Sequence, residues 1–170
     1  MKKTLLPLII CFAVLATASA QTDATTLVKI GQIAPEFSCT TIDGKTIDIT
    51  AMKGKIVMIN FFATWCGPCN SELPVLQKNI WDKYKDNPSF QLIILGREHN
   101  AKEVSDFVKA KSFTMPFAPD PKREIYKLYA TQYIPRNVII GKNGKIIFQN
   151  MGYNEKEFKE IEELLAKELK

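Results

Sequence analysis

The segment that decides the fold runs from residue 56 to residue 69 and reads IVMINFFATWCGPC. Its first half is almost entirely apolar, which is typical of a β-strand that is covered on both faces. Apolar residues then recur at helical spacing, at Leu73, Leu76 and Ile80, and predict a helix of about five turns packed on the sheet. Two cysteines therefore lie where a buried strand meets the start of a helix.

The spacing of Cys66 and Cys69 suits either a redox-active pair or half of a zinc site. Tetrahedral zinc needs four ligands, and beyond the first twenty residues the only other cysteine and histidine are Cys39 and His99. A redox pair is favoured, because the free amides and the dipole at a helix start stabilise a thiolate. We expect Cys66 to be the attacking sulfur and Cys69 the resolving thiol. A purely structural disulfide is the alternative.

The rest of the chain alternates between strands and helices. Turn signals at Asp43-Gly44 and at residues 142–144 predict two hairpins, and the strand-helix-strand unit around the cysteines implies a parallel crossover. These features predict an α/β fold with a central mixed β-sheet flanked by helices. The predicted strands are residues 37–41, 46–49, 55–62, 90–95, 137–140 and 145–149.

Three later helices are expected from their N-terminal signals. Asn100 and Asn154 are each followed by Glu three residues later, which matches a capping box. A third helix begins at Asp120-Pro121, since proline is favoured in the first turn. Its expected inward-facing residues are Ile125, Leu128 and Tyr129.

The segment from Phe61 to Cys69 resembles the active-site segment of the TlpA/ResA-like proteins of the thioredoxin superfamily. The likeness covers roughly residues 30–170. It includes Ala34-Pro35-Glu36-Phe37, Asp43-Gly44-Lys45, Lys53-Gly54-Lys55 and Ile134-Pro135. The resemblance implies a thioredoxin-like fold with an N-terminal β-hairpin and no bound cofactor.

The resemblance also implies roles for residues around the dithiol. Pro135 matches the family's cis-proline, which faces the two sulfurs, and an X-Pro bond can adopt that geometry at little cost. Ile134 would then touch the incoming sulfur, and Trp65, Gly67 and Pro68 would contact substrate. The alternatives are a trans proline that starts a strand and a tryptophan that belongs to the core.

Proton handling at the dithiol differs from that in thioredoxin itself. Thioredoxins have a buried aspartate six residues before the first cysteine, and this chain has Asn60 there, which cannot take up a proton. Glu72 matches a glutamate that ResA-like proteins place beside the dithiol, and burial would raise its pKa. The alternative is a solvated glutamate stabilised by the helix dipole. Arg136 and Asn137 depart from the small hydroxyl residues common after the family's cis-proline.

Two further residues carry chemistry of their own. Cys39 lies in a predicted strand and is expected to be a buried apolar residue rather than a third redox thiol. His99 follows a strand, and we expect it to be a polar surface residue of a loop. We predict no metal site in this chain.

The first residues have the pattern of a secretory signal. Lys2 and Lys3 precede an apolar stretch too short to span a bilayer comfortably, and Ala18-Ser19-Ala20 matches a cleavage site. We predict a signal peptide over residues 1–20, a linker over 21–29 and a thioredoxin-like domain over 30–170. An uncleaved anchor is the alternative. After cleavage we expect no stable membrane insertion and a location in the periplasm or another extracytoplasmic compartment.

The charge balance excludes nucleic acid as an expected partner. The whole chain carries 23 Lys and Arg against 18 Asp and Glu, a net charge of +5, which is ordinary for a soluble domain. The dithiol and the export signal together predict an exported thiol-disulfide oxidoreductase. The resemblance implies as partners exported proteins with disulfides, among them apocytochrome c during cytochrome c maturation, and a membrane electron donor that re-reduces the enzyme.

The direction of the reaction is expected to be reduction, because Gly-Pro is also the dipeptide of thioredoxin, whose potential is about −270 mV. Two other functions remain as alternatives. A peroxiredoxin-like peroxidase would need proline at Ile59 and threonine at Ala63. A Cu(I)-binding chaperone would use the soft dithiol together with His99.

Overall fold

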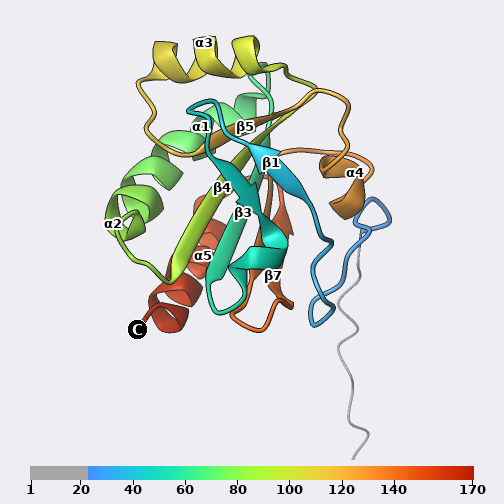
Figure 1. Cartoon of the computed structure of the whole chain (residues 1–170), viewed down its shortest axis with the longest axis vertical. Helices are drawn as coiled ribbons and strands as arrows, with labels where there is room; N and C mark the ends of the chain where they lie inside the picture. Colours follow the sequence, from blue (N-terminus) through green and yellow to red (C-terminus); the bar gives the residue numbers. More distant parts are fainter. Residues whose placement is uncertain (1–22) are drawn as a thin grey trace, which may run out of the picture.

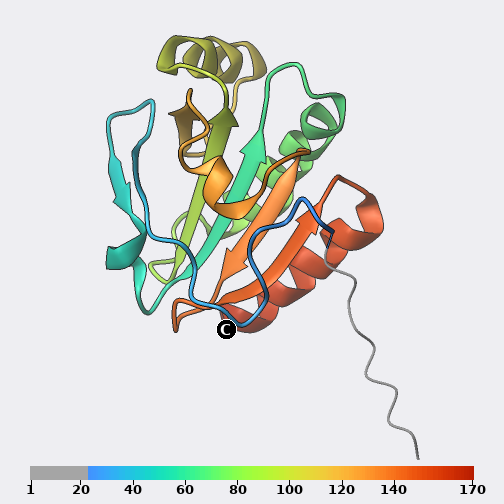
Figure 2. The same ribbon diagram turned by 90° about the vertical axis from the view of Figure 1, so that its right-hand side faces the viewer.

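The computed structural model describes residues 23–170, and the predicted signal peptide lies outside that range. A twisted sheet crosses the middle of the molecule, with helices on both faces (Figures 1 and 2). The strand order is β5-β4-β3-β6-β7, in which β3, β4 and β5 are parallel and β6 and β7 are antiparallel to their neighbours. The predicted thioredoxin-like architecture with a mixed central sheet is confirmed.

The strands agree with the sequence pattern except for one addition. A separate antiparallel pair, β1 and β2, forms the predicted N-terminal hairpin. The unpredicted strand is β5, which pairs with β4 at the edge of the sheet. The strands are β1 (Ser38–Thr40), β2 (Thr46–Asp48), β3 (Ile56–Phe62), β4 (Phe90–Arg97), β5 (Phe117–Asp120), β6 (Arg136–Ile140) and β7 (Ile146–Met151).

The helices differ from the expectation at two places. The long helix after the cysteines is α-helical through Leu76, with Pro74 inside it, and continues from Gln77 as a π-helical turn. The helices capped by Asn100 and Asn154 both form, but the capping box is complete only at Asn100, since at Asn154 only the side-chain oxygen accepts the N–H of Glu157. The helices are α1 (Gly67–Leu76), η2 (Gln77–Trp81), α2 (Asp82–Tyr84), α3 (Ala101–Lys111), α4 (Tyr126–Tyr129) and α5 (Glu155–Glu168), preceded by the 3-10 turn η1 (Ile49–Met52).

The predicted helix start at Asp120 is wrong. Asp120 ends β5, and its carboxylate accepts hydrogen bonds from the backbone N–H groups of Ile125 and Tyr126 at 3.2 and 2.8 Å. It therefore caps the short helix α4 from a distance instead of starting it. Leu128 is exposed, whereas Ile125 and Tyr129 face the core as expected.

Alternate residues of β3 face two separate cores. Met58 and Phe62 contribute to the core beneath α1, α3 and α5. Val57 and Ile59 point the other way, to a core closed by α4 and the N-terminal hairpin. This alternation places Asn60 on the α1 side of the sheet, which is the side that carries the cysteines.

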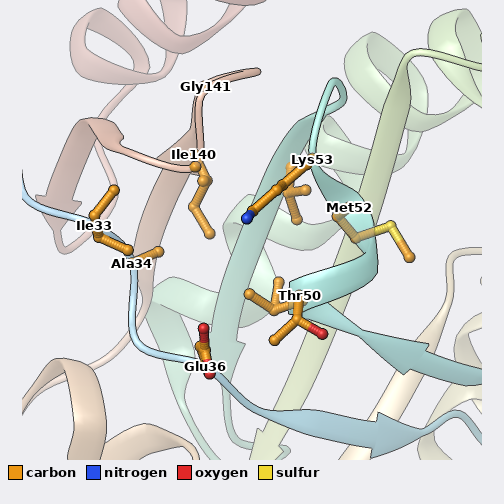
Figure 3. A pocket seen from close by; sticks show the side chains of 11 residues that line it. Ile33, Ala34, Glu36, Thr50, Met52, Lys53, Ile140 and Gly141 are labelled. Carbon is orange, nitrogen blue, oxygen red and sulfur yellow. The ribbon is translucent and has the colours of Figure 1, made fainter.

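The segment before the hairpin is packed along the domain. Thr26 forms an isolated bridge with Ala130, and the N–H of Leu27 donates to the carbonyl of Tyr129 at 2.9 Å. Between this segment and the sheet lies a small hollow of about 50 Å³, at the end of β3 away from the cysteines (Figure 3). Within residues 23–170, none of the helices has the length and apolar character that crossing a membrane requires.

Candidate active site

Cys66 and Cys69 form a disulfide at the N-terminus of α1, with an S–S distance of 2.08 Å. Cys66 is the N-cap residue, and its Sγ accepts the backbone N–H of Cys69 at 3.2 Å. Cys66 is 5% exposed and borders an open groove, whereas Cys69 is fully buried. A substrate that approaches through the groove reaches Cys66 before Cys69.

The loop before β6 faces this disulfide. The peptide bond between Ile134 and Pro135 is cis, so the predicted geometry is confirmed. The carbonyl oxygen of Ile134 lies 3.7 Å from the Sγ of Cys66. The backbone just before the proline is therefore the part of the chain that an incoming substrate meets beside the reactive sulfur.

Side chains from three directions hold this loop in place. The hydroxyl of Tyr126 donates to the carbonyl of Tyr133 at 2.7 Å, and Arg123 donates to the carbonyl of Thr131 at 2.6 Å. The Nε of buried Arg136 also donates to the Tyr133 carbonyl, at 3.2 Å. Tyr133 has a φ of 67°, which is unusual for a bulky residue. These hydrogen bonds fix the backbone conformation of Tyr133, so the loop is pre-organised before substrate arrives.

Glu72 lies inside the protein, one helical turn after Cys69. Its side chain is 1% exposed, so the alternative of a solvated glutamate is wrong. One carboxylate oxygen accepts an N–H from Asn60 at 2.9 Å, and the other accepts an N–H from Asn137 at 2.6 Å. Asn60 also donates to the side-chain oxygen of Asn137 at 2.8 Å. The three side chains form a closed, buried cluster.

Burial raises the pKa of the Glu72 carboxyl to about 7, against the opposing effect of the two amide hydrogen bonds. The predicted direction of the pKa shift is confirmed. Residues three apart share one face of a helix, and both Cys69 and Glu72 are buried on the inner face of α1. A carboxyl that titrates near neutral pH on this face is suited to take up and return the proton of the buried thiol.

The sequence did not reveal Asn137 as a member of this cluster. Asn60 and Asn137 are direct partners in the antiparallel register of β3 and β6, although they are 77 residues apart in the chain. Asn60 is the one polar residue of β3, and Asn137 directly precedes the apolar residues of β6. A polar amide next to apolar strand residues is the sequence signal that could have indicated the cluster, because a buried amide needs a polar partner.

The prediction for His99 is wrong, because this residue is buried. Its Nε2 accepts the backbone N–H of Thr64 at 2.9 Å, so His99 holds the turn that leads to Cys66. Its Nδ1 lies 3.7 Å from a carboxylate oxygen of Glu103 on α3. The ring of His99 also packs near the ring of Phe62 on β3, with a centroid distance of 6.3 Å, and the sequence around His99 gives no sign of these contacts.

The remaining predicted residues lie around the groove beside Cys66. Trp65 is 65% exposed and is therefore a surface residue, not part of the core. It lines the groove together with Gly67, Pro68 and Ile134. Cys39 is buried in β1 as expected, and burial raises the pKa of its thiol to about 11, which keeps it protonated and unreactive.

These features define a class of protein. A disulfide that joins the N-cap of a helix to its first turn, beside a cis-proline loop in a mixed sheet, belongs to the thioredoxin-like thiol-disulfide oxidoreductases. Comparison with known proteins identifies the family within that class.

The family model for redoxin matches residues 29–165. The thiol-disulfide oxidoreductase ResA of Bacillus thuringiensis is 37% identical over 139 residues, which cover 82% of this chain and 78% of ResA. The chain belongs to the redoxin family, and within it to the ResA-like proteins.

Two solved structures have the same fold. A Bacteroides thetaiotaomicron protein described as a candidate protein disulfide isomerase has a TM-score of 0.82 and 39% identity. The comparison covers 85% of this chain and 92% of that one. A Chlorobium tepidum protein described as a candidate thiol:disulfide interchange protein DsbE has a TM-score of 0.75 and 25% identity, over 84% of this chain and 99% of that one.

Proposed function

We propose that this protein reduces disulfides in extracytoplasmic proteins, with Cys66 as nucleophile and Cys69 as resolving thiol. The observation that carries the proposal is the pairing of one sulfur at the edge of a groove with one fully buried sulfur at a helix N-terminus, opposite the cis-proline loop. Free amide groups at that helix end favour the thiolate form of the first cysteine.

The reaction runs in two exchange steps. The Cys66 thiolate attacks one sulfur of the substrate disulfide, a mixed disulfide forms, and the other substrate sulfur leaves as a thiolate. Cys69 then loses its proton and attacks the Sγ of Cys66, which releases the second substrate thiol. The substrate gains two electrons from the two cysteines and two protons, one given up by Cys69 and one from solvent, and the protein ends with the Cys66–Cys69 disulfide.

Glu72 is proposed to be the group that takes the proton of Cys69. Asn60 stands where a thioredoxin has an aspartate, and instead it donates to the carboxylate of Glu72. The proton-accepting carboxyl is thereby displaced from the strand to the helix. Its polar surroundings continue outward, since Asn137 donates to Asn150 at 3.2 Å and Asn150 donates to Glu157 at 3.3 Å.

The cellular setting is part of the same proposal. A signal peptide over residues 1–20 would export the protein to the periplasm or an equivalent compartment, and a membrane electron donor would restore the dithiol. Exported proteins with vulnerable cysteines, such as apocytochrome c, are the proposed substrates. The names of the ResA relatives support the oxidoreductase chemistry on which this proposal rests.

The test is to trap the mixed disulfide. In a Cys69→Ser variant the second step is blocked, so substrate proteins remain bound to Cys66 and can be released with reductant and identified. The wild type is expected to reduce insulin disulfides, and a Cys66→Ser variant is not. An absence of trapped partners together with an absence of insulin reduction by the wild type would refute the proposal.

The alternative functions find less support at the site. A copper chaperone would use His99, but the Nε2 of that residue already accepts the N–H of Thr64. A peroxidase signature would require proline at Ile59 and threonine at Ala63, as noted above. Fast peroxide-dependent oxidation of Cys66 in stopped flow would favour the peroxidase.

A further inference from the structure

The groove beside Cys66 has charged groups of one sign on its wall. Trp65, Cys66, Gly67 and Pro68 form one side, and residues 131–134 form another. The charged residues that line the groove are Arg97, at the end of β4, and Arg123, just before α4. Arg97 ends the inner strand β4 and Arg123 follows the edge strand β5, so their proximity to the dithiol is a product of the fold.

These two arginines share a single carboxylate. Glu98 lies 3.2 Å from a guanidinium nitrogen of Arg97 and 3.6 Å from one of Arg123. One negative charge therefore faces two positive charges, which leaves the wall of the groove with a net positive charge. Glu98 itself is not among the lining residues.

Both guanidinium groups are held in position before any ligand arrives. They lie over the ring of the buried Tyr126, at 4.9 Å for Arg97 and 5.3 Å for Arg123. Arg123 is held further by its hydrogen bond to Thr131. A carboxylate that binds here loses little of its binding energy to ordering these side chains, and a planar guanidinium can donate to both of its oxygens at once.

The groove also presents aromatic surface. Trp65 and Tyr133 are 65% and 56% exposed, respectively, and line the groove near the reactive sulfur. An exposed apolar surface beside a catalytic sulfur suits the side chains and backbone of a polypeptide segment. The combination of aromatic surface and positive charge is complementary to a peptide that carries acidic side chains.

We propose that Arg97 and Arg123 are specificity-determining residues, which select polypeptide disulfides flanked by aspartate or glutamate. This inference rests on the proposed disulfide reductase function. An extended segment places every second side chain on the same face, so a carboxylate two residues from the target cysteine shares the face of that cysteine. Exchange at Cys66 then proceeds faster because the arginines hold the segment beside the thiolate.

The test uses the reduced full chain and matched peptides. Each peptide carries one cysteine as a mixed disulfide with uncharged 2-thiopyridine, and the residues two positions before and after it are Glu, Gln or Lys. Release of thiopyridone in stopped flow gives the rate constant for attack by Cys66. We expect the Glu peptide to react roughly tenfold faster than the Lys peptide at low ionic strength, with a smaller ratio in salt.

Variants separate specificity from folding. Arg123→Gln and Arg97→Gln are expected to lower the Glu-to-Lys rate ratio, because each slows the Glu peptide more than the Gln peptide. Glu98→Gln removes the competing carboxylate and is expected to raise the ratio. A structural defect would instead slow all three peptides alike. Lys127→Gln is the matched control, because Lys127 is exposed on α4 and does not line the groove.

Three outcomes would overturn the proposal. Equal rates for the Glu and Lys peptides would show that the arginines do not select acidic peptides. A Glu-to-Lys rate ratio that is unchanged in both Arg97→Gln and Arg123→Gln would show that other residues cause the preference. Oxidised glutathione that reacts as fast as the Glu peptide, with equal dependence on Arg123, would make the groove a site for small disulfides. Insulin reduction with no peptide preference leaves the reductase function intact, whereas failure with every disulfide refutes that function.

Discussion

The carboxyl of Glu72 makes folding stability depend on pH in a direction that can be worked out. Its pKa is about 7 in the folded protein and 4.5 when exposed, so between these values the folded state binds the extra proton. Its contribution to stability is fully present below pH 4.5 and is lost as pH rises through about 7. At about 1.36 kcal/mol per pH unit, this loss is about 3 kcal/mol.

The assay compares the wild type with Glu72→Gln, in which the side chain keeps its shape but does not ionise. Urea unfolding of both oxidised proteins, followed by tryptophan fluorescence, is measured from pH 4.5 to pH 8. The stability of the wild type relative to the variant is expected to fall by about 3 kcal/mol across this range. Glu160→Gln is the control, because Glu160 is exposed on α5 and its removal is expected to produce no such trend.

A constant difference between the wild type and Glu72→Gln would refute this reasoning. It would mean that the carboxyl titrates as it does in water, and that burial against α1 does not control its charge. The proposed transfer of the Cys69 proton to Glu72 would then lose its physical basis, because a carboxylate of ordinary pKa accepts a proton poorly at neutral pH.

Three further predictions concern the residues around this site. Asn137→Leu removes the N–H that donates to Glu72 at 2.6 Å, so the titration midpoint of the Glu72 carboxyl, measured by ¹³C NMR, is expected to rise above pH 7. The variant is also expected to lose about 2 kcal/mol of stability at pH 8. An unchanged midpoint would contradict this prediction. His99→Ala leaves the Thr64 N–H without its acceptor and is expected to cost about 2 to 3 kcal/mol in urea unfolding, more than His99→Gln. Gly96→Ala brings a Cβ within 2.8 Å of a Val104 methyl and is expected to lower the free energy of unfolding, measured in urea, by about 1 to 3 kcal/mol. The loss is expected to be smaller in a Val104→Ala background, and equal losses in the two backgrounds would exclude this clash.

The features that the sequence predicted are local ones. The apolar run of β3, the cysteines at the start of α1 and the capping residue Asn100 each depend on residues within a few positions of one another. Strand β5 was missed because it is four residues long, contains Pro119, and is ordered by pairing with β4. A short edge strand of this kind gains its conformation from its neighbour rather than from its own residues.

Periodicity and spacing along the chain thus predicted the α/β fold class and the dithiol, and the resemblance to the TlpA/ResA-like proteins identified the proline that faces it. Tertiary structure decided how the dithiol is surrounded. Antiparallel pairing brings Asn60 to Asn137 and both to Glu72, and the fold brings His99 to the N–H of Thr64. The pKa of a carboxyl and the charge of a groove depend on which groups meet across the sheet, and those contacts exist only once the whole chain has folded.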